Sequence, residues 1–127
     1  MKKRILLAED NPPTIEVMET ELELLGYQVT VARDGVEAVE RAASDSPDLI
    51  IMDILLPKID GLKAVAEIRA NPNTRNIPIL AATAKAMAQD REKCLAAGCD
   101  DYIAKPFTHI ELGAKVRKLL DAKQQRT

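Results

Sequence analysis

Acidic side chains follow two short apolar runs in this sequence, at the points where those runs end. Glu9 and Asp10 come directly after the apolar run at positions 5–8, and Asp53 comes directly after the run at positions 49–52. Carboxylates that are brought together repel each other, so at least one resists ionisation unless a cation lies between them. A hard ion such as Mg²⁺ prefers protein carboxylates, waters and a phosphate oxygen as ligands. The acidic residues therefore predict a Mg²⁺ site.

A threonine and a lysine stand at the ends of two further apolar runs. Thr83 follows residues 77–82, and Lys105 follows residues 101–104. Beside a metal and a carboxylate, an ammonium and a hydroxyl could hold the oxygens of an incoming phosphoryl group. An aspartate such as Asp53 can be the nucleophile that forms an acyl phosphate. Each residue alone is more often a turn residue, a helix cap or a surface lysine, but together they predict a phosphoryl-transfer site.

Apolar runs and helical patterns alternate along the chain. The runs predict strands over residues 5–8, 28–31, 49–52, 77–82 and 101–104. Apolar residues at helical spacing predict the inward faces Ile15, Met18, Leu22 and Leu25; Val36, Val39, Ala42 and Ala43; Leu62, Val65, Ala66 and Ile68; and Leu112, Val116, Leu119 and Leu120. An alanine-rich helix is expected over residues 84–97, and Gly26 and Gly98 are expected to end the helices before them.

Five strands alternating with five helices predict an α/β fold, with a doubly wound parallel sheet that helices cover on both faces. Ligands of such sheets bind beyond the carboxyl ends of the strands. All the candidate site residues stand at such ends, so this fold would bring them together.

The composition is typical of one compact domain. The chain has 127 residues, 46% of them hydrophobic, and we expect a single domain over residues 1–127, with its core over 3–120 and a frayed tail over 122–127. A formal net charge of −2 offers no bulk attraction to nucleic acid. No apolar run approaches the roughly 18 residues that cross a bilayer. Cys94 and Cys99 are typical of small core residues in a reducing compartment. We expect a cytoplasmic protein that contacts neither nucleic acid nor membrane directly.

At its strand ends the sequence resembles the response-regulator receiver domains of two-component systems. The resemblance covers roughly residues 3–120 and depends on four motifs: Glu9-Asp10-Asn11; Met52-Asp53-Ile54 followed by Pro57 and Asp60-Gly61; Ala82-Thr83-Ala84; and Lys105-Pro106. Each motif alone is weak, but the four in order are specific. The resemblance implies a flavodoxin-like sheet with strand order 2-1-3-4-5. It also implies a phosphorylation-activated switch of a phosphorelay, not an enzyme, similar to chemotaxis-type single-domain regulators.

The resemblance implies how the phosphoryl group and the metal would be bound. Asp53 would accept the phosphoryl group from a histidine kinase or a histidine phosphotransfer protein. Asp10 and Asp53 would bind Mg²⁺, together with Glu9, directly or through water, and the backbone carbonyl of Leu55.

Four more residues receive roles from the same resemblance. Lys105 and Thr83 would hold the phosphoryl oxygens, and the peptide bond between Lys105 and Pro106 would be cis. Tyr102 and Thr83 would form the switch, although Tyr102 could equally be a plain core aromatic with a solvated hydroxyl. The signal would pass to an unknown downstream protein through the face formed by the fourth helix, the fifth strand and the fifth helix.

The sequence departs from the family pattern near the phosphoacceptor. Leu55 is apolar where some relatives carry a polar side chain, and Lys85 is basic. Both positions flank the path of the water that hydrolyses an acyl phosphate. We expect Leu55 to be unable to orient that water, so that dephosphorylation is slow. An unchanged decay rate of the phosphoprotein in a Leu55→Asn variant would contradict this hypothesis.

Other classes of protein share parts of this pattern. A phosphatase of the haloacid-dehalogenase type would need a second aspartate at position 55, and a flavodoxin-type protein would need a loop rich in Ser, Thr and Gly in place of residues 9–13. A receiver-like scaffold that is never phosphorylated and the receiver of a hybrid kinase both stay open. Because the chain ends after the last predicted helix, we expect a stand-alone switch.

Overall fold

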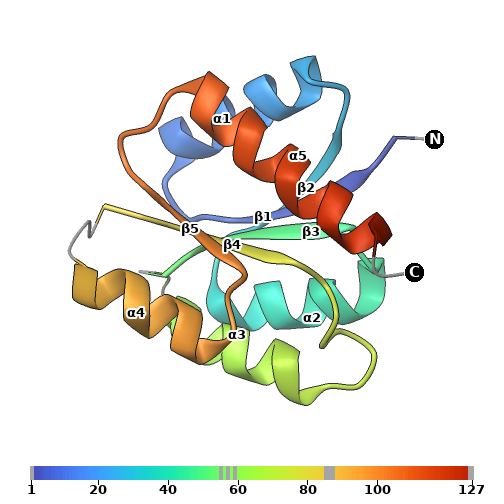
Figure 1. Cartoon of the computed structure of the whole chain (residues 1–127), viewed down its shortest axis with the longest axis vertical. Coiled ribbons are helices and arrows are strands. Elements are labelled where there is room, and N and C mark those ends of the chain that lie inside the picture. Colours follow the sequence, from blue (N-terminus) through green and yellow to red (C-terminus); the bar gives the residue numbers. More distant parts are fainter. Residues whose placement is uncertain (1, 55, 57, 59, 85–87, 126–127) are drawn as a thin grey trace.

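The computed structural model describes residues 2–54, 56, 58, 60–84 and 88–125, to which all structural statements refer. Strands and helices alternate along them (Figure 1). The strands are β1 (Arg4–Ala8), β2 (Gln28–Ala32), β3 (Leu49–Asp53), β4 (Ile79–Thr83) and β5 (Asp101–Ala104). The helices are α1 (Pro12–Leu24), α2 (Gly35–Asp45), α3 (Gly61–Ala70), α4 (Ala88–Ala97) and α5 (His109–Gln125).

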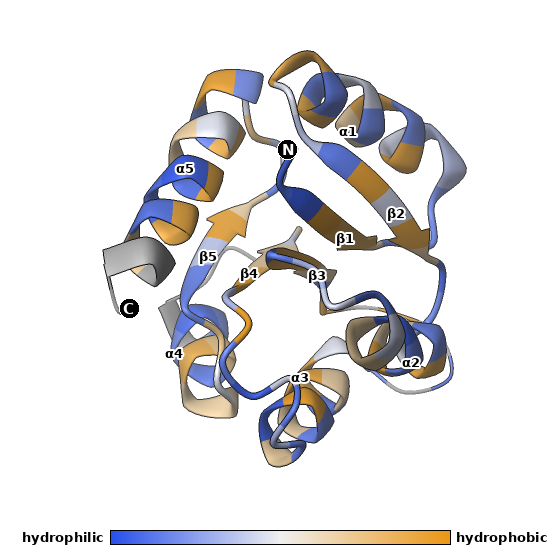
Figure 2. Ribbon diagram, turned by 90° about the vertical axis from the view of Figure 1, so that its right-hand side faces the viewer, coloured by the Kyte–Doolittle hydropathy of each residue, from blue (hydrophilic) through white to orange (hydrophobic). Residues whose placement is uncertain are grey.

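The strands form one parallel sheet in the order β2-β1-β3-β4-β5, which confirms the predicted doubly wound, flavodoxin-like fold. Helices α1 and α5 lie on one side of the sheet, and α2, α3 and α4 lie on the other (Figure 2). The chain reverses its direction of winding at β1, so β1 and β3 are neighbours in the centre of the sheet. Ligand sites of such sheets lie at this point.

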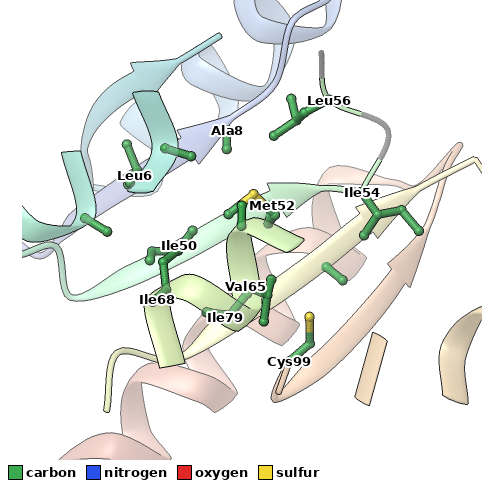
Figure 3. Packing of buried hydrophobic residues seen from close by; sticks show 14 of the residues in the cluster. Leu6, Ala8, Ile50, Met52, Ile54, Leu56, Val65, Ile68, Ile79 and Cys99 are labelled. Atoms are coloured by element: carbon green, nitrogen blue, oxygen red, sulfur yellow. The ribbon is translucent and has the colours of Figure 1, made fainter. Parts of the chain in front are cut away.

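Alternate residues of each central strand pack into opposite layers, because successive side chains of a strand point to opposite faces. Leu6, Ile50 and Met52 belong to the core under α2, α3 and α4 (Figure 3). Ile5 and Ile51 belong to the core under α1 and α5. Strands β3 and β4 are buried along their whole length, as expected for continuous apolar runs in a parallel sheet.

Side-chain caps start several helices at the carboxyl edge of the sheet. The Oδ1 atoms of Asn11, Asp34 and Asp60 accept hydrogen bonds from backbone N–H groups in the first turns of α1, α2 and α3. Thr108 and Glu111 exchange side-chain and backbone hydrogen bonds in a capping box at the start of α5. The caps fix where each loop at this edge ends.

Several of the predicted inward positions are wrong. Leu25 is the C-cap of α1 and is 43% exposed, and Val36 is 38% exposed. Ala43 and Ala66 are also exposed. The buried positions that the prediction missed on α2 are Gly35 and Ala38. The inward face predicted for this short helix is therefore rotated about the helix axis relative to the face that is buried. The reason is that alanine is small enough to face either the core or the solvent.

Element boundaries also differ from the prediction. Helix α4 begins at Ala88, whereas the alanine-rich pattern predicted a helix from residue 84; residues 85–87 lie outside the described part of the chain. Strand β4 begins two positions later than expected and includes Thr83. Helix α5 continues to Gln125, into the segment predicted to fray, and alanine, lysine and glutamine are good helix formers. Gly26 and Gly98 have positive φ angles after α1 and α4, as predicted for helix ends.

Candidate functional site

Three carboxylates meet at the carboxyl edge of the sheet. Asp53 is the last residue of β3, and Glu9 and Asp10 follow β1, which pairs with β3. One carboxylate oxygen of each residue lies within 4.8 Å of the others. Glu9 and Asp53 are buried, with 2% and 8% of their surface exposed, and Asp10 is exposed. The structure therefore brings together the acidic cluster predicted from the sequence.

Lys105 reaches this cluster from the end of β5, which lies two strands away from β3 in the sheet. Its Nζ donates hydrogen bonds to Oε1 of Glu9 and to Oδ2 of Asp53, the latter at 3.4 Å. The loop after β5 is held to β4, since the Lys105 N–H donates to the Thr83 carbonyl at 2.8 Å. The bond from Lys105 to Pro106 is cis, as expected from the family resemblance. The ammonium is thus fixed between the two buried carboxylates.

Burial and charge act in opposite directions on these groups. The pKa of the Glu9 carboxyl is raised, mainly by burial. The hydrogen bond from Lys105 lowers this pKa and the charge of Asp53 raises it, so the hydrogen bond offsets only part of the effect of burial. Burial alone would lower the pKa of the Lys105 ammonium, but the hydrogen bonds and charges of Glu9 and Asp53 outweigh burial and raise it. Three carboxylates against one ammonium leave a formal charge of −2. This excess negative charge suits a divalent cation.

The loop between β1 and α1 holds Glu9 in place. Oε2 of Glu9 accepts hydrogen bonds from the N–H groups of Asp10 and Asn11, at 3.1 and 3.2 Å. The backbone N–H of Glu9 donates to the carbonyl of Ala32 in β2 at 2.9 Å. Glu9 is therefore a buried, fixed acceptor, while Asp10 stays open to solvent.

The start of α3 supports the end of β3. The N–H of Gly61 donates to the carbonyl of Ile54 at 3.0 Å. A Cβ atom at Gly61 would lie 2.4 Å from the Asp53 carbonyl oxygen and 2.4 Å from the Ile54 Cα. Only glycine permits this approach of two backbone segments. The family motif includes Gly61, but the sequence did not indicate that it supports Asp53, because the contact joins two segments through the fold.

The two residues predicted to form the switch, Thr83 and Tyr102, lie on the neighbouring strands β4 and β5. Thr83 is the last residue of β4 and is fully buried. Tyr102 is half-buried on β5 and packs against the core cluster that contains Cys94 of α4, as does Ala97. Burial, followed by the Cys94 thiol and the Asp90 charge, raises the Tyr102 pKa. Leu55 lies outside the described residues.

An ion pair that the sequence did not predict lies between two loops at this edge of the sheet. Nζ of Lys58 lies 3.2 Å from Oδ2 of Asp34, so it links the segment before α3 to the N-cap of α2. Lys58 has a φ of 70°, in the left-handed region that non-glycine residues rarely adopt. The N-cap hydrogen bond from Glu37, with Lys58 adding to it, lowers the Asp34 pKa.

The fold and this site define a class of protein: a flavodoxin-like α/β domain with acidic residues and a lysine at the switch point of its sheet. Residues 5–117 match the family model for the response regulator receiver domain. The chain belongs to this family, which makes it a receiver domain of two-component signalling.

Curated relatives and solved structures agree with this assignment. The chain is 41% identical over 120 residues to the response regulator MprA of Mycobacterium ulcerans, covering 94% of this chain and 51% of the relative. It thus spans about half the length of the curated relatives it matches.

Two solved receiver domains have the same fold over nearly the whole chain. The receiver domain of a sensor histidine kinase from Pseudomonas aeruginosa PAO1 is 46% identical, with a TM-score of 0.90, covering 95% of this chain and 99% of that one. That structure has a magnesium ion coordinated in its active-site cleft. A CheY-like receiver domain protein from Methanospirillum hungatei is 25% identical, with a TM-score of 0.92 and full coverage of both chains.

None of the helices in the described ranges is both long and apolar enough to cross a bilayer.

Proposed function

We propose that this receiver domain is a switch that takes a phosphoryl group onto Asp53 from a histidine kinase or a histidine phosphotransfer protein. The observation that carries the proposal is the convergence of the Glu9, Asp10 and Asp53 oxygens, with the Lys105 ammonium 3.4 Å from Asp53. A receiver domain is a signalling switch and not a classical enzyme. The only reactions we assign to it are its own phosphorylation and a slow dephosphorylation.

Asp53 is the residue best placed to act as the nucleophile. It ends a central strand, is buried, and is supported from behind by the start of α3. Transfer would form a bond between an Asp53 oxygen and phosphorus while the bond from phosphorus to the donor breaks. Lys105 and the Thr83 hydroxyl would then stabilise the charge on the phosphoryl oxygens.

The acidic cluster fits a Mg²⁺ cofactor by its donor set. All three groups are carboxylates, and they carry more negative charge than Lys105 neutralises. Asp10 and Asp53 would bind the ion directly, Glu9 directly or through water, and Leu55 through its carbonyl. When bound, Mg²⁺ would neutralise charge between the carboxylates and the phosphoryl oxygens. A neighbour's receiver domain with magnesium in its cleft supports this assignment.

We also propose the path of the signal. Thr83 and Tyr102 lie on the paired strands β4 and β5, and Tyr102 packs toward α4. A shift of Thr83 toward the phosphoryl group would allow Tyr102 to turn inward and change the α4–β5–α5 face, where a downstream protein would bind. We place the switch in the cytoplasm, with residues 1–127 as one domain whose core spans residues 3–120, acting through a protein partner and not through nucleic acid.

A receiver within a hybrid kinase is the second candidate. The 46% identity to the receiver domain of a sensor histidine kinase favours it. In that case the phosphoryl group would pass onward from Asp53 to a phosphotransfer protein. Incubation of the phosphorylated chain with such a protein, followed by loss of the phosphoryl group to it, would distinguish this candidate from a terminal switch.

The test of the main proposal is intact mass after incubation with acetyl phosphate, with and without Mg²⁺. Wild type should gain one phosphoryl group only when Mg²⁺ is present, and Asp53→Ala should gain none. A gain in Asp53→Ala would disprove the assignment of the phosphoacceptor. No gain in wild type, from acetyl phosphate or from a histidine kinase, would favour the scaffold that is never phosphorylated.

A further inference from the structure

An apolar groove lies between α1 and the segment after β5, and Lys105 of the candidate site is one of its lining residues. Its volume is about 460 Å³, and one wall is formed by Pro13, Val17 and Met18 of α1. The opposite wall is formed by Pro106 and Phe107, after β5. Val17 is 56% exposed, so this wall presents apolar surface to solvent. Figure 1 shows the chain after β5 passing α1 on its way to α5.

One side chain borders both the groove and the candidate site. Lys105 lines the groove, and its Nζ also contacts Glu9 and Asp53. Ala84, the residue after Thr83, lines the groove as well. The leaving group of a phosphodonor that Lys105 holds at Asp53 would therefore lie beside the groove.

We propose that this groove binds the leaving group of a small-molecule phosphodonor and selects donors whose leaving group is apolar and planar, such as an aromatic acyl phosphate. The inference rests on the proposed function. In the reaction an Asp53 carboxylate oxygen bonds to phosphorus, and the bond from phosphorus to the donor's carboxyl oxygen breaks. The electron pair leaves with the aromatic carboxylate, so no proton is needed in the groove.

The lining explains why a flat apolar group is preferred over a small polar one. Pro13, Pro106 and Phe107 present ring surfaces, and aromatic groups pack well against such surfaces. Burying an aromatic ring there removes apolar area from water, which an acetyl group can do only in small part. Glu21 also lines the groove, so a second negative charge on the leaving group would be repelled.

The test compares second-order rate constants for phosphorylation by benzoyl phosphate and acetyl phosphate, with Mg²⁺, in wild type and two variants. Val17→Asn makes the exposed apolar wall polar without changing its charge. The matched control is Val36→Asn, because Val36 is a similarly exposed valine on α2, outside the groove. Comparing the ratio of the two rate constants between proteins cancels the intrinsic reactivity of the donors.

We expect the benzoyl-to-acetyl ratio to fall roughly tenfold in Val17→Asn, because the ring loses one apolar wall, and to stay at the wild-type value in Val36→Asn. A ratio in Val17→Asn within twofold of wild type would overturn the inference. If neither donor phosphorylates wild type while a histidine kinase does, this inference fails and the proposed function stands; if the kinase does not phosphorylate it either, the proposed function fails as well.

A second measurement needs no variant. Free benzoate should slow phosphorylation of wild type by acetyl phosphate, whereas acetate at the same concentration should not, since only benzoate fills the groove. Equal effects of the two carboxylates would overturn the inference even if Val17→Asn did not fold.

Discussion

Replacing Gly61 with alanine should destabilise the fold and slow phosphorylation of Asp53 together. The new Cβ would lie 2.4 Å from the Asp53 carbonyl oxygen and 2.4 Å from the Ile54 Cα. Both atoms belong to the backbone, so no side-chain rotation can relieve the contact. Either α3 or the end of β3 must move, and the end of β3 carries Asp53, the proposed phosphoacceptor.

The magnitude follows from two opposing effects. Inserting a methyl group into a tightly packed place costs about 1–3 kcal/mol, and we take about 3 kcal/mol because the obstructing atoms are backbone atoms. Alanine is preferred over glycine in helices by about 1 kcal/mol, which offsets part of this cost. The expected loss of unfolding free energy is therefore about 2 kcal/mol.

Gly113→Ala is the matched control, because Gly113 also lies within a helix. A Cβ there would lie 3.2 Å from Cδ1 of Leu25, a partly exposed side chain that can move away. We expect this variant to be stabilised by up to about 1 kcal/mol. Opposite signs of the two Gly→Ala changes would show that the close approach, and not helix propensity, decides the effect at Gly61.

Two assays test the prediction. Urea denaturation followed by circular dichroism gives the unfolding free energy of wild type, Gly61→Ala and Gly113→Ala. Intact mass against time gives their rates of phosphorylation by acetyl phosphate with Mg²⁺, at a urea-free condition where all three are folded. The reasoning would be refuted if Gly61→Ala were as stable as wild type and were phosphorylated at the same rate.

Three further predictions concern stability away from the site. Arg69 donates hydrogen bonds to three backbone carbonyls and one carboxylate. In urea denaturation, Arg69→Met should therefore lower the free energy of unfolding by about 3 kcal/mol. The control Arg75→Met, at an exposed side chain, should change it by less than about 0.5 kcal/mol. Burial raises the pKa of the Cys99 thiol from its ordinary value of 9.0 to about 12. The folded state keeps the thiol proton. The contribution of Cys99 to the free energy of unfolding is therefore complete below pH 9 and is lost as the pH rises toward 12. The stability difference between wild type and Cys99→Ala should thus change by up to about 1.4 kcal/mol per pH unit in that window, and a pH-independent difference would contradict the assignment. Ser46 is the C-cap of α2 and has a φ of 47°, in the left-handed region that glycine adopts without strain. Ser46→Gly should therefore stabilise the folded protein by about 0.5–1 kcal/mol, while Ser44→Gly, inside α2, should destabilise it by a similar amount. Stability changes of the same sign in the two variants would rule out backbone strain at Ser46 as the cause.

The fold could be predicted because its signals are local. A strand shows itself as a short apolar run and a helix as apolar residues three and four apart, and each signal depends only on residues within a few positions. The strands over 49–52 and 101–104 were therefore placed almost correctly. Where local signals were weak, the prediction failed: the inward stripe at Val36 and Ala43 was out of phase, because the helix contains many small residues that fit either environment.

The sequence by itself determined which polar residues stand at strand ends and which elements carry them, because alternation of strands and helices allows few arrangements. Only the tertiary structure decided how these residues meet. Lys105 pairs with Glu9, 96 positions away in the sequence, as well as with Asp53, and Gly61 supports Asp53 through a backbone contact. Such pairings depend on strand order and on the register between β1, β3 and β5. Local patterns of side chains carry no information on strand order or register, because hydrogen bonding and packing between distant segments determine both.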